Sequence, residues 1–109
     1  MLPQDQIEEL TSLCPDAAVF TETGEEFVLL PSLKLPSGAT PAVVDGLLCP
    51  RSHSGYATRL FLSQPVIGRG NNWTTVRILD RVWHTPSWRD VGADLRLIEI
   101  VLGHFNAYR

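Results

Sequence analysis

The chain has 109 residues, of which 44% are hydrophobic and 19% charged, and its formal net charge at pH 7 is −3. This length and composition are typical of one compact soluble domain and exclude a disordered or low-complexity chain. Nine Lys and Arg against twelve Asp and Glu also exclude general affinity for nucleic acid, which requires a basic surface. We therefore expect a protein or small-molecule partner.

The N-terminal stretch lacks the basic start and apolar middle of a secretion signal. The longest apolar runs of the chain are far shorter than the roughly 20 residues that cross a bilayer, so no membrane association is expected. Two cysteines permit at most one disulfide bond. These features together predict a protein of the reducing cytoplasm.

The first predicted element is a helix over residues 3–14. Its apolar residues recur at helical spacing, and Asp5 lies in the early turns, where the helix dipole favours negative charge. Pro15 ends this helix, because the residue before a proline is disfavoured in helical backbone.

Residues 17–63 are predicted to form an antiparallel meander. Apolar and β-branched runs alternate there with short turns that contain glycine or proline. We expect four strands, over residues 17–21, 27–35, 42–49 and 58–63. The third is apolar on both faces apart from Asp45 and Gly46, so it is predicted to be central.

The rest of the chain is predicted to be irregular and then helical. Residues 73–83 show no clear period, and Pro86 breaks both helix and strand geometry in the segment that follows. A stripe at helical spacing then predicts a C-terminal helix that starts at Asp90 or Asp94; the stripe consists of Leu95, Ile98, Leu102 and Phe105.

The thiols and imidazoles predict no catalytic cysteine and no metal. Cys14 and Cys49 each lie on an apolar stretch, and no cation precedes Arg51 near Cys49, so both are interpreted as buried structural thiols. The histidines and cysteines form neither a C-x-x-C nor an H-x-x-x-H pair. We expect no metal site and no cofactor.

The strongest candidate for chemistry is the proline-containing segment over residues 83–90. Its reactive side chains are His84, Thr85, Ser87, Arg89 and Asp90. A histidine within reach of a hydroxyl can remove its proton. The residues equally allow a structural interpretation, in which His84 hydrogen-bonds a backbone carbonyl and the neighbouring tryptophans fill the core.

Several short motifs, in this order, resemble the ubiquitin-conjugating-enzyme-like (UBC-like) superfamily, and within it the bacterial branch called prokaryotic family E. The residues that carry the resemblance are Leu35-Pro36-Ser37-Gly38, Pro41, Asp45-Gly46-Leu47-Leu48-Cys49-Pro50, Gly55-Tyr56, Leu60-Phe61-Leu62, Trp83-His84, Trp88, Gly92 and Asp94-Leu95. The resemblance implies one α+β domain over residues 1–109. Its expected parts are an N-terminal helix, a four-stranded antiparallel meander, an irregular active-site segment and a C-terminal helix.

The resemblance also implies a function in a bacterial ubiquitin-like modification pathway. Such a protein accepts a ubiquitin-like modifier from an adenylating activating enzyme and transfers it to an amine of a protein target. Ordinary members carry the modifier on a cysteine after the fourth strand, whereas this chain has no cysteine after Cys49. Family E is marked instead by a histidine near that place, which His84 matches. The family likeness further makes the first helix a docking surface for the activating enzyme, through Gln4, Gln6, Glu8 and Glu9.

Three functional hypotheses follow. In the first, the Ser87 hydroxyl, or that of Thr85, accepts the modifier as an oxyester, with His84 as general base or oxyanion donor and Arg89 and Asp90 in support. In the second, the protein is a catalytically inactive adaptor that binds the activating enzyme or the modifier. In the third, unrelated to the family, an apolar patch binds a partner protein; its tryptophans are Trp73, Trp83 and Trp88.

Overall fold

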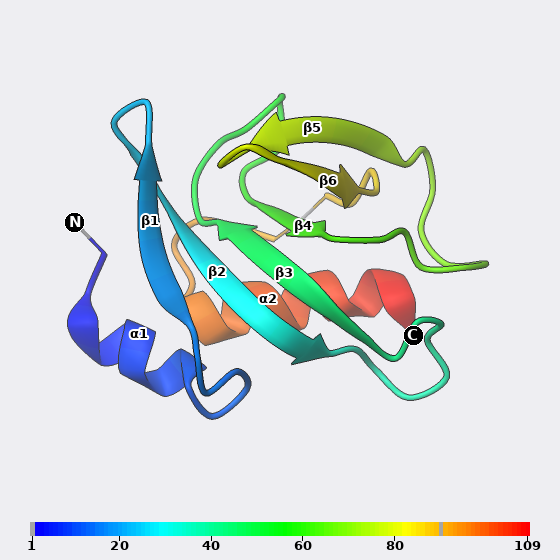
Figure 1. Ribbon diagram of the computed structural model, residues 1–109, viewed down its shortest axis with the longest axis horizontal. Helices are drawn as coiled ribbons and strands as arrows, with labels where there is room; N and C mark the ends of the chain where they lie inside the picture. Colours follow the sequence, from blue (N-terminus) through cyan, green and yellow to red (C-terminus); the bar gives the residue numbers. More distant parts are fainter. Residues whose placement is uncertain (1, 90) are drawn as a thin grey trace.

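A six-stranded antiparallel sheet forms most of the molecule in the computed structural model, which describes residues 2–89 and 91–109 (Figure 1). The strands lie in the order β1-β2-β3-β4-β6-β5, so β1 and β5 are the two edges of the sheet. The elements are α1 (Gln4–Leu10), β1 (Ala18–Glu22), β2 (Glu25–Lys34), β3 (Val43–Cys49), β4 (Arg59–Leu62), β5 (Thr74–Ile78), β6 (Arg81–Thr85), α2 (Leu97–Phe105) and the 3₁₀ turn η1 (Asn106–Tyr108).

The first half of the chain follows the sequence prediction closely. α1 and the strands β1 to β4 lie within a few residues of their predicted ranges, and β3 has a neighbouring strand on each side, which confirms its central position. α1 ends at Leu10, earlier than predicted. The hydroxyls of Thr11 and Ser12 donate hydrogen bonds to backbone carbonyls of the last helical turn, which satisfies acceptors that a helix end leaves free.

The predicted UBC-like fold, with four strands and an irregular active-site segment, is wrong. Residues 74–85 instead form the β5–β6 hairpin, which extends the sheet to six strands. Ile78 pairs with Arg81 across a two-residue turn, Leu79-Asp80, in which both φ angles are positive, at 53° and 59°. A turn of this geometry matches the twist of hairpin strands, and its two residues are usually Asn-Gly or Asp-Gly. Because Leu79-Asp80 is neither, the sequence does not indicate a turn here. Among the described residues the result is a mostly-sheet half-barrel with two short α-helices.

The sheet buries a different cluster on each face. α1 and α2 cover one face, where Val28, Leu48 and Leu60 are fully buried (Figure 1). The opposite face carries a second cluster, because the β5–β6 hairpin packs Ile78 and Trp83 against residues from the middle of the sheet. Those residues are Phe27, Leu47, Cys49 and Phe61. We call this second side the hairpin face.

α2 starts later and buries a different side than the sequence predicts. It begins at Leu97, whose N–H donates to the Gln6 side-chain oxygen at 2.9 Å, so the start is fixed by α1. Of the predicted stripe, Phe105 is buried, whereas Leu95 and Leu102 are each 40% exposed, so the prediction of the buried face holds only in part. The buried side chains are Leu97, Ile100, Val101, His104 and Phe105. Of the two predicted starting residues, Asp94 lies before the helix and Asp90 lies outside the described residues.

β4 and β6 pair at a single register position, Leu62 with His84. Two residues further, Pro86 would lie opposite Leu60, and proline has no N–H with which to continue the ladder. Side chains replace the missing ladder: the Thr85 hydroxyl donates to the Leu60 carbonyl at 3.2 Å, and the Arg59 guanidinium donates to the Pro86 carbonyl at 3.0 Å. The strands therefore separate beyond this point, and a pocket lies there on the hairpin face.

No helix among the described residues is both long enough and apolar enough to cross a membrane.

Candidate functional site

The structure separates the residues of the predicted catalytic segment. Successive strand residues point to opposite faces of a sheet, so Thr85 lies on the hairpin face with Trp83, whereas His84 lies on the helix-covered face opposite Leu62. No hydrogen bond joins the His84 side chain to Ser87 or Thr85. The Thr85 hydroxyl is buried and bonded to a backbone carbonyl, and Ser87 is half-buried at the pocket.

The supporting residues have other surroundings. Arg89 is exposed, and its guanidinium lies 4.8 Å from the ring centre of Tyr56. Asp90 lies outside the described residues. Gln6 and Glu9 join α1 to α2, by hydrogen bonds to the backbone of Leu97 and to the side chain of Arg96, while Gln4 and Glu8 are exposed.

The tryptophans are parts of the packed structure. Trp83 is 1% exposed, and its indole N–H donates to the Ile78 carbonyl. Trp73 and Trp88 are half-buried and also donate to backbone carbonyls, those of Arg69 and Gly103. Because Trp83 is buried, these three residues do not form one exposed apolar patch.

The thiols are buried, as predicted. Cys14 and Cys49 are free and fully buried, and Cys14 donates to the Pro31 carbonyl. Burial raises the pKa of both thiols, which disfavours the reactive thiolate. Within residues 2–89 and 91–109, no group of three or more His, Cys, Asp or Glu side chains is placed to hold a metal ion.

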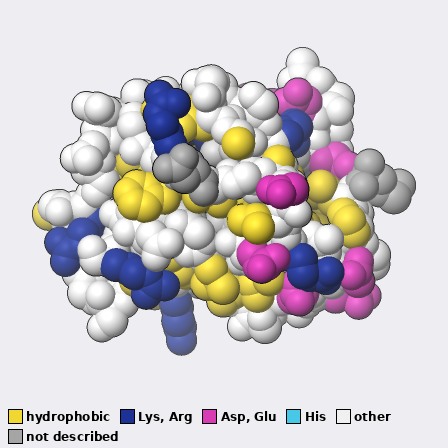
Figure 2. Space-filling model, turned by 180° about the vertical axis from the view of Figure 1, so that it is seen from behind, with side chains coloured by type: hydrophobic (Ala, Val, Ile, Leu, Met, Phe, Trp, Pro, Cys, Tyr) yellow, Lys and Arg dark blue, Asp and Glu magenta, His cyan; other side chains and the backbone are white. Residues whose placement is uncertain are grey.

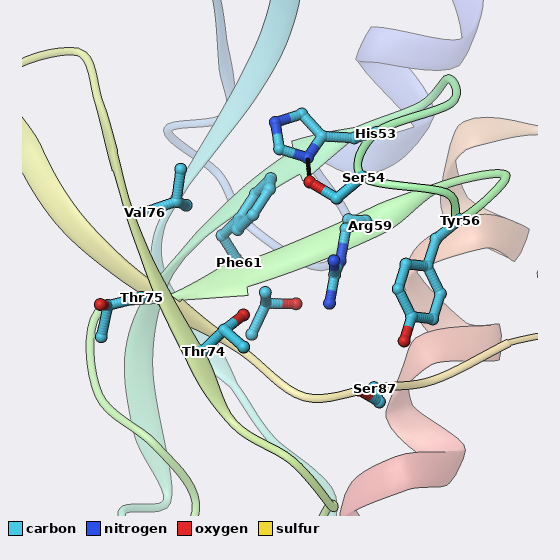
Figure 3. Close-up of a pocket in the computed structure, with 10 residues that line it drawn as sticks. His53, Ser54, Tyr56, Arg59, Phe61, Thr74, Thr75, Val76 and Ser87 are labelled. Atoms are coloured by element: carbon cyan, nitrogen blue, oxygen red, sulfur yellow. Dashed lines mark hydrogen bonds between the residues drawn. The ribbon is translucent and has the colours of Figure 1, made fainter.

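Hydroxyls and one guanidinium dominate the pocket on the hairpin face, which has a volume of about 420 Å³ (Figure 3). β5, β6, the start of β4 and the turn around residues 53–56 supply its walls. The lining residues are His53, Ser54, Tyr56, Arg59, Phe61, Thr74, Thr75, Val76, Thr85 and Ser87. None of them carries a carboxylate, although acidic residues outnumber basic ones in the whole chain. We call this the Arg59 pocket.

Arg59 is the charged centre of this pocket. It is 6% exposed, and in Figure 3 its guanidinium lies in the middle of the lining side chains. One of its nitrogens donates to the Pro86 carbonyl, and the group stacks on Tyr56 at 4.1 Å from the ring centre. Among the described residues it has no acidic partner. Burial lowers the pKa of Arg59, yet an arginine stays charged in proteins, so the cation is partly desolvated and has no carboxylate beside it among the residues that the structure describes.

A tight turn brings His53 and Ser54 to the same pocket. The backbones of His53 and Tyr56 exchange two hydrogen bonds. The two residues that separate them, Ser54 and Gly55, have positive φ angles of 53° and 85°. The Ser54 hydroxyl lies 2.9 Å from His53 Nδ1 (Figure 3). Burial, and then the charge of Arg59, lowers the pKa of His53, so its imidazole is neutral at pH 7 and can both donate and accept a hydrogen bond.

Arg59, His53 and Ser54 were not predicted as site residues from the sequence. One signal for Arg59 was present: it is a charged residue two positions before Phe61 in an apolar strand, and therefore on the same face. Nothing comparable marks His53, because its role depends on the curvature that brings the hairpin across the sheet. The chemistry that the assembled residues support is the binding of an anion, by one buried cation and several hydroxyl donors.

No family model matches the chain, and no curated protein or solved structure matches it.

Proposed function

We propose that the protein binds an anionic group, a carboxylate or a phosphate, of a partner molecule in the Arg59 pocket. The observation that carries this proposal is the burial of the Arg59 guanidinium without an acidic partner among the described residues. Removing an unpaired charge from water costs several kcal/mol. A bound anion would offset this cost by charge-assisted hydrogen bonds with the guanidinium.

The rest of the pocket supports the same ligand chemistry. Ser54, Thr74 and Ser87 supply hydroxyl groups, which can donate to oxygen atoms of a carboxylate or phosphate. A wall without carboxylates avoids repulsion of an incoming anion. The Tyr56 ring covers one side of the guanidinium, and such stacking holds the planar group in place for bidentate bonding.

Calorimetric titration with sodium acetate and with inorganic phosphate tests the proposal. The wild-type protein should bind one of these anions saturably, and the anion with the higher affinity identifies the ligand class. Arg59→Met should weaken binding at least about tenfold, because a charge-assisted hydrogen bond contributes about 1.5 to 3 kcal/mol. Arg96→Met is the matched control and should bind normally. Equal affinity in wild type and a folded Arg59→Met variant would overturn the proposal.

The transfer of a ubiquitin-like modifier is a second candidate, supported by one observation: Ser87 lines the same pocket as Arg59. In this reaction the Ser87 oxygen would attack the thioester carbonyl of the modifier. The thiol of the activating enzyme would leave with the hydroxyl proton, and a target amine would later displace the oxyester. Arg59 is suitably charged to stabilise the oxyanion. His53 is the imidazole that lines this pocket, whereas His84 lies on the other face.

A gel assay distinguishes transfer from simple binding. The protein is incubated with its activating enzyme, modifier and ATP. Transfer predicts an adduct that resists thiol reductant, is cleaved by mild base and is lost in Ser87→Ala but kept in His84→Ala. A stable complex with no adduct under any condition would instead favour the adaptor hypothesis. In either case we place the protein in a reducing cytoplasm, which the two free, buried thiols support.

A further inference from the structure

β5 is an open sheet edge directly beside the Arg59 pocket. Its pairing with β6 follows from the two-residue turn: the Ile78–Arg81 pair next to the turn exchanges hydrogen bonds, and bonded and non-bonded pairs then alternate along the hairpin. Thr75 and Arg77 occupy non-bonded pairs, opposite His84 and Val82. The backbone N–H and C=O groups of Thr75 and Arg77 therefore point away from β6. No backbone hydrogen bond to another described segment occupies them.

The same strand forms a wall of the pocket. Thr74, Thr75 and Val76 all line it, and Figure 3 shows β5 across the pocket from the turn that carries His53 and Ser54, with Arg59 between them. An extended chain paired to β5 would point alternate side chains toward the hairpin face. A side chain on that face would enter the pocket that holds the guanidinium.

We propose that an extended segment of a partner protein adds to the sheet at β5 and places an acidic side chain on Arg59. This proposal rests on the proposed function and names the ligand as an acidic peptide segment. Main-chain hydrogen bonds with Thr75 and Arg77 would supply affinity, and the pocket would supply specificity for the acidic residue, as in other complexes formed by strand addition.

Charge favours β5 over β1 as the edge for such a partner. β5 carries one charged residue, the exposed Arg77, and the pocket beside it holds Arg59 and no carboxylate. β1 carries one charged residue, Glu22, and no basic residue, so this edge offers no cation to an acidic segment. Charge complementarity therefore favours β5 as the edge to which an acidic segment of a partner adds.

Peptide binding with alternate N-methylation tests the edge pairing. The probe is a capped, amidated peptide of alternating threonine and valine with one central glutamate, titrated into isotope-labelled protein and followed by NMR. Two further versions of the peptide are N-methylated, one at the odd-numbered amides and the other at the even-numbered amides. Only one of these two peptides therefore loses the N–H groups that face β5. One phase should bind at least about tenfold more weakly than the unmodified peptide, and the other should bind normally. Equal affinity of the two phases would overturn the proposal.

Two variants of the protein test the same edge pairing independently. Arg77→Pro removes one outward N–H but no bond of the β5–β6 ladder, and should weaken the peptide at least about fivefold, the effect of losing roughly one hydrogen bond. Arg77→Ala keeps the N–H and controls for the side chain. A melting curve establishes that the proline variant is folded; if a folded Arg77→Pro binds as Arg77→Ala does, edge pairing is excluded.

The failure of this inference is separable from the failure of the proposed function. If acetate or phosphate binding depends on Arg59 while the peptide binds no better than acetate, only the strand addition is wrong. If replacing the glutamate by glutamine, or Arg59 by methionine, changes no affinity, the anion pocket itself is wrong.

Discussion

Two arginines of this small protein have opposite surroundings. The Arg96 side chain is 45% exposed and lies between two carboxylates, with nitrogen–oxygen distances of 3.0 Å to both Asp5 and Glu9. Arg59 is 6% exposed and has no carboxylate beside it among the described residues. Figure 2 shows acidic and basic side chains mixed at the side of the molecule where α1 lies. The arginine that has carboxylate partners is thus Arg96, whose charge is already stabilised by solvent.

This difference separates a structural ion pair from a candidate binding group. An exposed pair contributes little, typically 0 to about 1 kcal/mol, because water and salt screen it. A buried, unpaired cation destabilises the fold unless something compensates it. Arg96 is explained by the docking of α1 on α2. We propose that Arg59 is instead compensated by a bound anion.

The largest effect is expected for Arg59→Met. Its loss of anion binding should come with no serious loss of stability: the free energy of unfolding without ligand should fall by no more than about 1 kcal/mol, because the lost hydrogen bond to Pro86 is offset by removal of a desolvated charge. Phosphate or acetate should raise the melting temperature of the wild type but not that of the variant. Thermal unfolding with and without the anions measures both. A variant that is strongly destabilised would show that Arg59 is structural.

The stability of the protein should depend on pH through His104, which is buried close to the charge of Arg59. Burial, and then Arg59, lowers the pKa of His104 to about 4. The Thr58 hydroxyl donates to the Val91 carbonyl, so the His104 Nε2–H must donate to the Thr58 oxygen, at 2.9 Å. The native imidazole is therefore neutral, with its proton on Nε2.

The sign of the pH dependence follows from this depressed pKa. The unfolded state has the ordinary pKa near 6.5 and binds the proton first. The stability contribution is complete above pH 6.5 and is lost as the pH falls toward 4, by about 3 kcal/mol in total. Denaturant unfolding between pH 4 and 7 should show this loss in the wild type and a flatter profile in His104→Gln. Identical profiles would contradict a buried neutral histidine.

Thr58→Val tests the same network with a smaller effect. The substitution keeps the shape but leaves the His104 N–H and the Val91 carbonyl without their partner, at a cost of about 2 kcal/mol for unsatisfied buried groups. Chemical denaturation measures it. The same substitution at an exposed position, Thr75→Val on the open edge of β5, is the matched control and should change stability by less than about 0.5 kcal/mol. Equal losses in the two variants would show that the buried network contributes nothing.

Arg96→Met should have the smallest effect of all. Its two ion pairs are exposed, so their loss should lower the free energy of unfolding by less than Thr58→Val does, and high salt should reduce the difference. Denaturation at low and high ionic strength measures this. A loss larger than that of Thr58→Val would show that the Arg96 pairs hold α1 in place and would weaken the comparison with Arg59.

The regular part of the fold was predictable, and the hairpin was not. α1 and the first four strands follow from apolar periodicity and from glycine- or proline-containing turns, which are local signals. The β5–β6 hairpin turns on Leu79-Asp80, which contains no glycine, and a leucine rarely adopts the positive φ that Leu79 has there. In β6, Val82 is exposed and Thr85 is buried, so the residue types there do not follow the usual alternation of buried apolar and exposed polar side chains.

The candidate site was predictable only in part for the same reason. Ser87 lines the Arg59 pocket, and its role as a nucleophile stays a prediction. His84 was paired with it by proximity along the chain, but in a strand the neighbour of a pocket residue points to the opposite face. Arg59 and His53 reach the pocket only because β4 and β6 separate at Pro86, which requires knowledge of the strand order.

NMR spectra of the arginine side-chain N–H groups, recorded during titration with inorganic phosphate and with acetate, show whether the buried Arg59 guanidinium binds an anion. The Arg59 signals should shift saturably with one of these anions, whereas those of Arg96, already paired with Asp5 and Glu9, should not. If neither anion moves the Arg59 signals, or if both arginines respond equally, Arg59 is not an anion-binding group.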